Sequence, residues 1–181
     1  MAPDIHRAVQ VLLDEAEIRR LLYAYCRAVD RGDLVALRAV YHPDATDDHT
    51  GVFTGTVDGF IEMLGESLAK GEVTCTRHCL SNITIELDGD VAICESYFDA
   101  YDQRHVGGGV VDEVMAGRYL DRLERREGTW RIAARRVVWD HGGSAPASPA
   151  HWHHDPSGFL FGSRSAEDPS TTWFRERGPG Q

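Results

Sequence analysis

Two residues of this sequence, Asp30 and His78, could together transfer protons. Asp30 lies in Val29-Asp30-Arg31-Gly32-Asp33, directly after an amphipathic stretch, and His78 lies in Thr76-Arg77-His78-Cys79, inside an alternating stretch. A carboxylate that orients an imidazole allows it to take a proton from a substrate without a metal ion or coenzyme. On spacing alone, a structural role is the simpler interpretation of each residue: a turn aspartate paired with an arginine, and a half-buried histidine bonded to the backbone.

The stretch from Ile18 to Val29 predicts a helix that ends at Asp30. Its apolar residues recur three and four positions apart, as one face of a helix requires: Ile18, Leu21, Leu22, Tyr25, Cys26 and Val29. We expect the helix to begin near residues 5–8 and to end before Gly32. Because Tyr25 lies on the apolar face, its hydroxyl is expected to point inward.

Further helices and four long strands are predicted along the chain. Leu34–Tyr41 predicts a short helix, residues 46–53 a short strand or loop, and Thr56 can cap a helix that runs to about Lys70-Gly71. Alternating residues then predict two pairs of strands, with Asp88-Gly89 as a hairpin turn in the first pair: Val73–Leu87, Asp90–Gln103, Val110–Arg125 and Thr129–Asp140. Helices followed by antiparallel strands indicate an α+β domain, with the helices on one face of a curved sheet.

The strand over residues 90–103 has two faces that the pattern does not rank. One face carries Tyr97, Asp99 and Tyr101, and the other carries Cys94, Phe98 and Ala100. Polar residues occur on both faces, so either could meet the helices. The face of Tyr97, Asp99 and Tyr101 is a candidate lining of a pocket, and the alternative is that it faces solvent.

The composition narrows the class of partner. The 181 residues carry a net charge of −10 without a separate basic cluster, which argues against nucleic acid. The sequence contains neither an apolar stretch of membrane-spanning length nor an apolar segment near residue 1, so we expect a cytoplasmic protein that does not contact membranes. The four cysteines are expected to be reduced and buried.

Metal sites and cofactor sites are not expected. In Cys75-x2-His78-Cys79, strand alternation directs residues 75 and 79 to one face and residue 78 to the other. The cluster formed by His42, Asp44, Asp47, Asp48 and His49 matches no known coordination spacing, and residues 151–155 contain three histidines in a predicted loop. Residues 107–109 are glycines without a following helix, so they do not predict a phosphate-binding loop.

The region after residue 140 differs from the rest of the chain. Residues 141–181 are rich in Gly, Pro, Ser and His and show no period, yet they contain aromatic and apolar residues that a disordered tail would lack: Trp152, Phe159, Leu160, Phe161, Trp173 and Phe174. We expect a domain over residues 1–140 and an extension over residues 141–181. The extension is expected to pack on the domain, cover a cavity or contact a neighbouring subunit.

The order of the motifs resembles the SnoaL-like branch of the NTF2-like superfamily over residues 16–140. The motifs are the helix with Tyr25 and Asp30, then Arg77-His78-x3-Asn82, Leu87-Asp88-Gly89-Asp90-x-Ala92, and Trp130-Arg131-Ile132-x2-Arg135. The resemblance implies a cone, in which a strongly bent antiparallel sheet is wrapped by N-terminal helices around a deep pocket.

The resemblance also implies a site. The resemblance is strongest to dehydratases and a dehydrochlorinase of that branch. These enzymes use an Asp–His pair at the positions of Asp30 and His78. Tyr25 would stand beside the pair as a third catalytic residue, and because it replaces a lysine of the dehydrochlorinase, dehydration is favoured. The substrate pocket is expected to include Tyr97, Asp99, Tyr101, Asn82, His49 and Arg135.

The expected function is a cofactor-independent lyase of the dehydratase type. His78 would be the general base, and the substrate a hydrophobic polycyclic, polyketide or steroid-like small molecule. The same pair would also serve an isomerase or an aldol-type cyclase, and the cone fold also occurs in non-catalytic binding or assembly subunits. By analogy we expect a homo-oligomer, either a trimer or a dimer.

Overall fold

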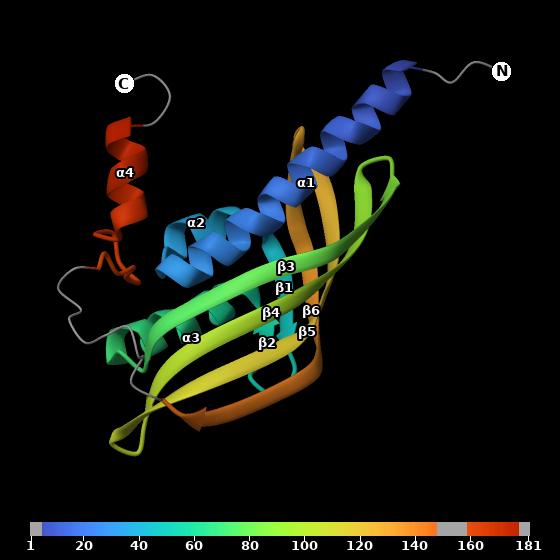
Figure 1. The fold of residues 1–181 in the computed structure, drawn as a ribbon. Coiled ribbons are helices and arrows are strands. Elements are labelled where there is room, and N and C mark those ends of the chain that lie inside the picture. Colours follow the sequence, from blue (N-terminus) through green and yellow to red (C-terminus); the bar gives the residue numbers. More distant parts are fainter. Residues whose placement is uncertain (1–4, 148–158, 178–181) are drawn as a thin grey trace.

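The computed structural model describes residues 5–147 and 159–177. Within these ranges helices and short strands come first and long strands follow (Figure 1): α1 (Ile5–Arg31), α2 (Leu34–Ala39), β1 (Tyr41–His49), β2 (Phe53–Thr56), α3 (Val57–Lys70), β3 (Val73–Asp88), β4 (Val91–Val106), β5 (Gly109–Arg126), β6 (Thr129–Pro146) and α4 (Pro169–Arg177). The predicted α+β class is confirmed. Trp152 and the histidines at residues 151–154 lie outside the described residues.

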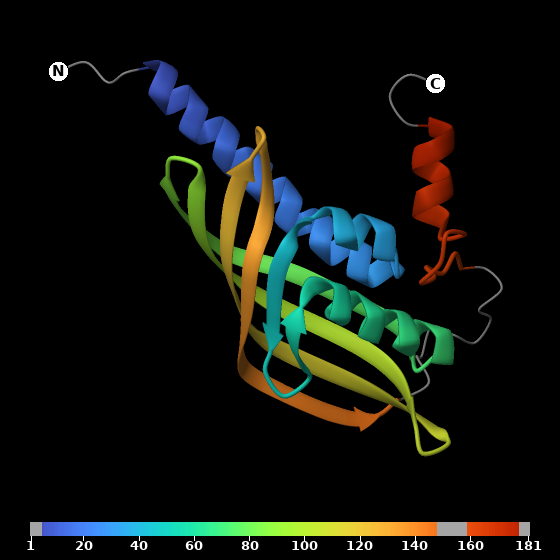
Figure 2. The same cartoon turned by 180° about the vertical axis from the view of Figure 1, so that it is seen from behind.

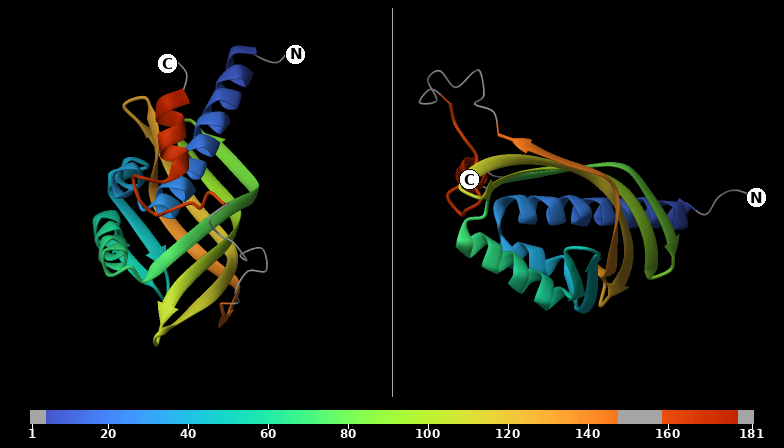
Figure 3. Two further views of the ribbon diagram at one scale, coloured as in Figure 1. Left: turned by 60° about the vertical axis from the view of Figure 1, so that its left-hand side comes forward. Right: turned by 90° about the horizontal axis from the view of Figure 1, so that it is seen from below.

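The strands form one strongly curved, open sheet. Their order is β2-β1-β6-β5-β4-β3, with β1 parallel to β6 and every other neighbouring pair antiparallel. Helices α1 and α3 lie in the hollow of the sheet (Figure 3), and the view from behind shows β1 and β2 beside α3 (Figure 2). This is the expected cone. Strand β3, which carries His78, is at one edge of the sheet.

Local signals account for the ends of the helices. Gly32 has a φ of 65°, which ends α1, and the Asp33 side chain then accepts a hydrogen bond from the N–H of Ala36 to cap α2. Thr56 caps α3 as predicted, and Gly71 ends it in the left-handed conformation. None of the described helices is long and apolar enough to span a membrane.

The segment after α2 differs from its prediction. The helix ends at Ala39, and Tyr41 begins β1, which continues to His49. The parallel pairing of β1 with β6 shifts register between Tyr41 and Thr46, and Pro43 lies inside that shift. Because proline has no N–H to donate, it interrupts the pairing without preventing the strand. The predicted short helix is therefore present but two residues shorter, and the strand that follows begins earlier than predicted.

One face of β4 meets the helices, and it is the face of Cys94, Phe98 and Ala100. The buried residues are Ala92, Cys94, Ser96, Phe98 and Ala100, whereas Tyr97 is 40% exposed on the opposite face. The pocket lining predicted from Tyr97, Asp99 and Tyr101 is therefore wrong. On the inner face, the ring of Phe98 stacks on that of Tyr119 with centroids 4.5 Å apart, and the small residues on either side of Phe98 leave room for this contact.

Candidate active site

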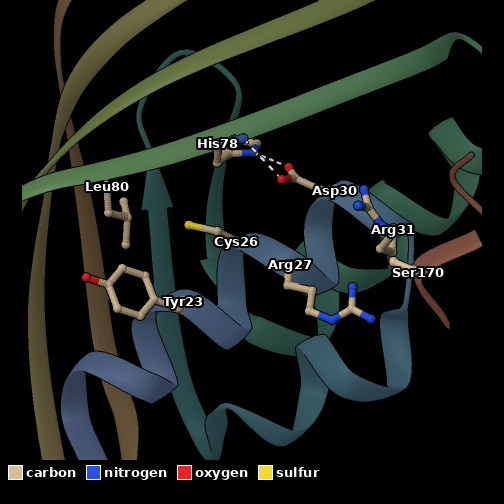
Figure 4. A pocket seen from close by; sticks show the side chains of 8 residues that line it. All are labelled: Tyr23, Cys26, Arg27, Asp30, Arg31, His78, Leu80 and Ser170. Atoms are coloured by element: carbon tan, nitrogen blue, oxygen red, sulfur yellow. Dashed lines mark hydrogen bonds and ion pairs between the residues drawn. The ribbon is translucent and has the colours of Figure 1, made fainter. Parts of the chain in front are cut away.

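Asp30 and His78 meet where the last turn of α1 crosses β3 (Figure 4). Asp30 Oδ1 lies 2.7 Å from His78 Nδ1, and Asp30 Oδ2 accepts a hydrogen bond from the His78 backbone N–H at 3.2 Å. Because β3 is an edge strand, a backbone N–H on its outer side has no strand partner, and the carboxylate takes that place. The structure thus brings together the two residues singled out by the sequence.

The contact leaves the imidazole arranged for proton transfer. Only 9% of Asp30 is exposed, and the His78 side chain is largely covered. A carboxylate at Nδ1 favours the tautomer with the proton on that nitrogen, so Nε2 is the atom free to accept a proton. The carboxylate also stabilises the imidazolium that forms when Nε2 takes a proton.

A cavity of about 350 Å³ opens beside the pair. Its walls come from α1, β3 and the first turn of α4, and the lining residues are Tyr23, Cys26, Arg27, Asp30, Arg31, His78, Leu80 and Ser170. Figure 4 shows Tyr23 and Leu80 on one side, Arg27, Arg31 and Ser170 on the other, and the pair between them. The cavity has the size of a small-molecule site and a polarity that changes along its length.

Tyr25 does not line this cavity. It is 2% exposed, and its ring lies 3.9 Å from the Arg135 guanidinium carbon and packs edge-on against Tyr41 and Tyr119. Burial raises the pKa of the Tyr25 hydroxyl well above its usual value, and the nearby Arg135 only partly opposes the rise. Its predicted place beside the pair is therefore wrong.

Helix geometry explains the error and shows which signal was missed. Residues five apart differ by about 140° around a helix axis, so Tyr25 and Asp30 point in different directions. Tyr23, Cys26, Arg27 and Asp30 are spaced i, i+3, i+4 and i+7, which places them on one face. That spacing could have identified the cavity wall before the structure was known.

Arg135 lies in the core, where it pairs with Asp121. Its Nε and one terminal nitrogen each donate to a carboxylate oxygen at 2.7 Å, and both side chains are fully buried. The guanidinium carbon lies 3.9 Å from the ring centroid of Tyr25 and 4.1 Å from that of Tyr119, and these two rings meet edge to face. Arg135 thus organises the core beneath α1 and does not line the cavity of the pair.

The other predicted pocket residues also lie elsewhere. His49 is hydrogen-bonded to the buried carboxylate of Asp47, and the His49 ring stacks on Phe60. The same carboxylate accepts a hydrogen bond from the Tyr41 hydroxyl. Asn82 is exposed in a left-handed conformation at a register shift of β3. Asp99 and Tyr101 border a separate cavity of about 280 Å³ on the outer face of the sheet.

The cysteines differ in their burial. All four cysteines are free, with Cys26 and Cys94 buried and Cys75 and Cys79 exposed, so the expectation of burial holds for two of them. Within residues 5–147 and 159–177, His, Cys, Asp and Glu side chains form no group of three suited to a metal ion.

Comparison with known proteins places this geometry in context. A model of the SnoaL-like domain matches residues 10–136. Among solved structures, a scytalone dehydratase-like protein from Novosphingobium aromaticivorans has a TM-score of 0.68 and 21% identity, covering 79% of this chain and 95% of that one. A hexachlorocyclohexane dehydrochlorinase (LinA type 2) has a TM-score of 0.68 and 19% identity, covering 80% and 95%.

A third similar structure is the Kfla4162 protein from Kribbella flavida, with a TM-score of 0.66 and 21% identity, covering 74% of this chain and 95% of that one. No curated protein matches the sequence significantly. At these identities the structural matches establish a common fold, and they leave the reaction to be argued from the site.

Proposed function

The chain belongs to the SnoaL-like domain family, and from that premise we propose that it is a cofactor-independent lyase of the dehydratase type, with His78 as its general base. The observation that carries the proposal is the 2.7 Å contact between Asp30 and His78 at the wall of a cavity. A buried carboxylate that orients an imidazole toward a small-molecule site is an arrangement suited to general acid–base chemistry.

The proposed reaction begins with proton removal from a carbon next to a carbonyl group. His78 Nε2 takes the proton, and the electron pair of the broken C–H bond moves toward the carbonyl oxygen to form an enolate. When the enolate collapses, the C–O bond to a neighbouring hydroxyl breaks, and the His78 imidazolium returns its proton to the departing oxygen as water forms. Asp30 stabilises the imidazolium between these two steps.

The polarity of the cavity supports a substrate with an apolar body and an oxygen-bearing end. An apolar ring system would pack against Tyr23 and Leu80, and polar groups would lie toward Arg27, Arg31 and Ser170. We therefore propose hydroxylated polycyclic, steroid-like or polyketide compounds as the substrate class.

The test is a screen of hydroxylated steroids and polyketides, read by mass spectrometry. Loss of about 18 Da identifies dehydration, the water lost in the proton-abstraction chemistry proposed here. An isomer of unchanged mass would identify the second candidate, an isomerase or aldol-type cyclase, because the same pair can return the proton to another carbon. If the wild-type protein changes no compound of the panel while binding several of them, the lyase assignment is wrong.

A further inference from the structure

Arg164, far from the pair in sequence, contacts both elements that carry it. One terminal nitrogen of its guanidinium donates to the Val73 carbonyl at 3.2 Å, and the other donates to the Val29 carbonyl at 3.1 Å. Val29 immediately precedes Asp30 in the last turn of α1, and Val73 is the first residue of β3, which carries His78. A single planar group thus spans the gap between the helix end and the strand.

The Val29 carbonyl is a favourable partner for a cation. Carbonyls in the last turn of a helix lack partners further along the helix and lie at the negative end of its dipole. The Val29 carbonyl accepts the Gly32 N–H at 3.1 Å, so the guanidinium adds a second donor to the same oxygen and complements the dipole. Its fork holds two acceptors at fixed geometry, which the single ammonium of a lysine cannot do equally well.

Arg164 also lies within electrostatic range of Asp30. Burial lowers the pKa of the Arg164 guanidinium, while the carboxylates of Asp102 and Asp30 oppose that shift. The Nε of Arg164 has no hydrogen-bond partner among the described residues, so the two backbone carbonyls and these carboxylates are what compensates its burial. A buried cation without such compensation would be strongly unfavourable.

The segment that carries Arg164 is held in place by Asp168. This residue is 1% exposed, accepts hydrogen bonds from the backbone N–H groups of Ser163 and Ser170, and lies 3.2 Å from Arg31 Nε. Arg31 and Ser170 both line the cavity of the pair. The described C-terminal segment, residues 159–177, therefore borders the cavity through Ser170 and brings Arg164 to the carbonyl of Val29, next to Asp30.

We propose that Arg164 is a positioning residue for the Asp30–His78 pair: it ties the end of α1 to the start of β3 and so holds the Asp30 carboxylate against His78. The consequence for catalysis rests on the proposed function, whereas the positioning itself does not. Residues 159–177 are then part of the site and not an appendage to it.

The test uses the full-length chain and needs no substrate. In Arg164→Gln, the His78 backbone N–H, which donates to Asp30, should exchange with solvent about tenfold faster or more, as expected when a hydrogen bond to a charged acceptor is loosened. The Nδ1–H resonance of His78 should broaden in the same variant. Arg164→Lys should fall between Gln and the wild type.

Two controls separate positioning from a general loss of packing. Arg118→Gln removes an arginine that pairs with Asp140 on the outer face of the sheet and should leave both His78 signals unchanged. In Arg164→Ala, guanidinium ion at concentrations far below those that unfold proteins should restore the Nδ1–H resonance, because the small cation can occupy the vacated position.

Unchanged His78 exchange in Arg164→Gln, or the absence of guanidinium rescue, would overturn the proposal. Because these readouts require no turnover, they can fail while Asp30 and His78 still prove catalytic. They can equally succeed in a protein that turns over no compound of the panel. Once a substrate is found, Arg164→Gln should lower kcat and leave KM within about twofold, since the residue acts through Asp30 and does not contact substrate.

Discussion

The Asp30 carboxylate accepts hydrogen bonds from both the ring and the backbone N–H of His78. An exposed ion pair holds its partners loosely and contributes little, whereas this carboxylate is fixed at two points of one residue and is largely buried. The second bond also satisfies an edge-strand N–H that would otherwise need water. The same contact therefore stabilises the helix–strand crossing and orients the imidazole.

The cavity face of α1 predicts that Tyr23 matters for binding and Tyr25 does not. Tyr23→Ala removes one apolar wall, so we expect KM to rise about tenfold with a smaller change in kcat, as when about 1.4 kcal/mol of binding is lost. Tyr25→Phe keeps the buried ring over Arg135 and should retain activity within about threefold. Steady-state kinetics on any compound turned over decides this, and a loss of about 100-fold in Tyr25→Phe would restore Tyr25 to the site.

The buried Arg135–Asp121 pair predicts that removing one partner costs more stability than removing both. Arg135→Met leaves Asp121 as an unpaired buried charge, so unfolding free energy should fall by about 3–5 kcal/mol. Arg135→Met combined with Asp121→Leu should recover part of that loss, because no charge is then stranded. Urea denaturation of the wild type and of both variants measures these differences, and a double variant less stable than Arg135→Met would contradict this account.

The four cysteines should differ in reactivity. Burial raises the pKa of the Cys26 and Cys94 thiols to about 12, so only about one in ten thousand is ionised at pH 8. We expect iodoacetamide to modify the exposed Cys75 and Cys79 in the folded protein, and all four after unfolding. Peptide mass mapping provides the measurement. Labelling of Cys26 as fast as Cys79 would show that the cavity thiol is more open than the structure indicates.

Docking of residues 159–177 should be lost in acid. Burial raises the pKa of Asp168, but hydrogen bonds from Ser170 and Ser163 together with Arg31 outweigh it and leave the pKa below the usual 3.8. A carboxyl group with a lowered folded pKa contributes stability above its unfolded pKa and loses it as the pH falls through the folded value. The segment should therefore stay docked above about pH 4 and detach below that.

The amide resonances of Ser163 and Ser170 report this transition, since both groups donate to Asp168. Asp168→Asn should abolish the pH dependence. Glu167→Gln, at an exposed neighbour, should leave the transition in place. An identical acid transition in Asp168→Asn would assign the effect to another group.

Local sequence signals were sufficient for much of the fold. The apolar period of α1, the Thr56 cap and the Asp88-Gly89 hairpin depend on neighbouring residues, so the chain itself displays them. The convergence of Asp30 and His78, 48 positions apart, followed from the motif order and not from spacing.

The remainder depended on tertiary packing. Both faces of β4 contain polar and apolar residues, and only contact with the helices decides that Phe98 points inward and Tyr97 outward. The role of Arg164 could not be predicted, because an arginine in a Gly- and Ser-rich segment has no period and its acceptors are backbone carbonyls. Such contacts leave no residue-type signature in the sequence.

The central claim is that His78, oriented by Asp30, removes a proton from a bound small molecule. The most direct measurement incubates the protein in D2O with the panel of hydroxylated steroids and polyketides and follows the mass of each compound. Wild-type protein should cause loss of water or uptake of deuterium at the acidic carbon. His78→Ala and Asp30→Asn should each be slower by at least about 100-fold, the range for positioned acid–base groups. His141→Ala changes an exposed histidine on the outer face of the sheet, away from the pair, and its rates should match those of the wild type. Full rates in both His78→Ala and Asp30→Asn would contradict the claim.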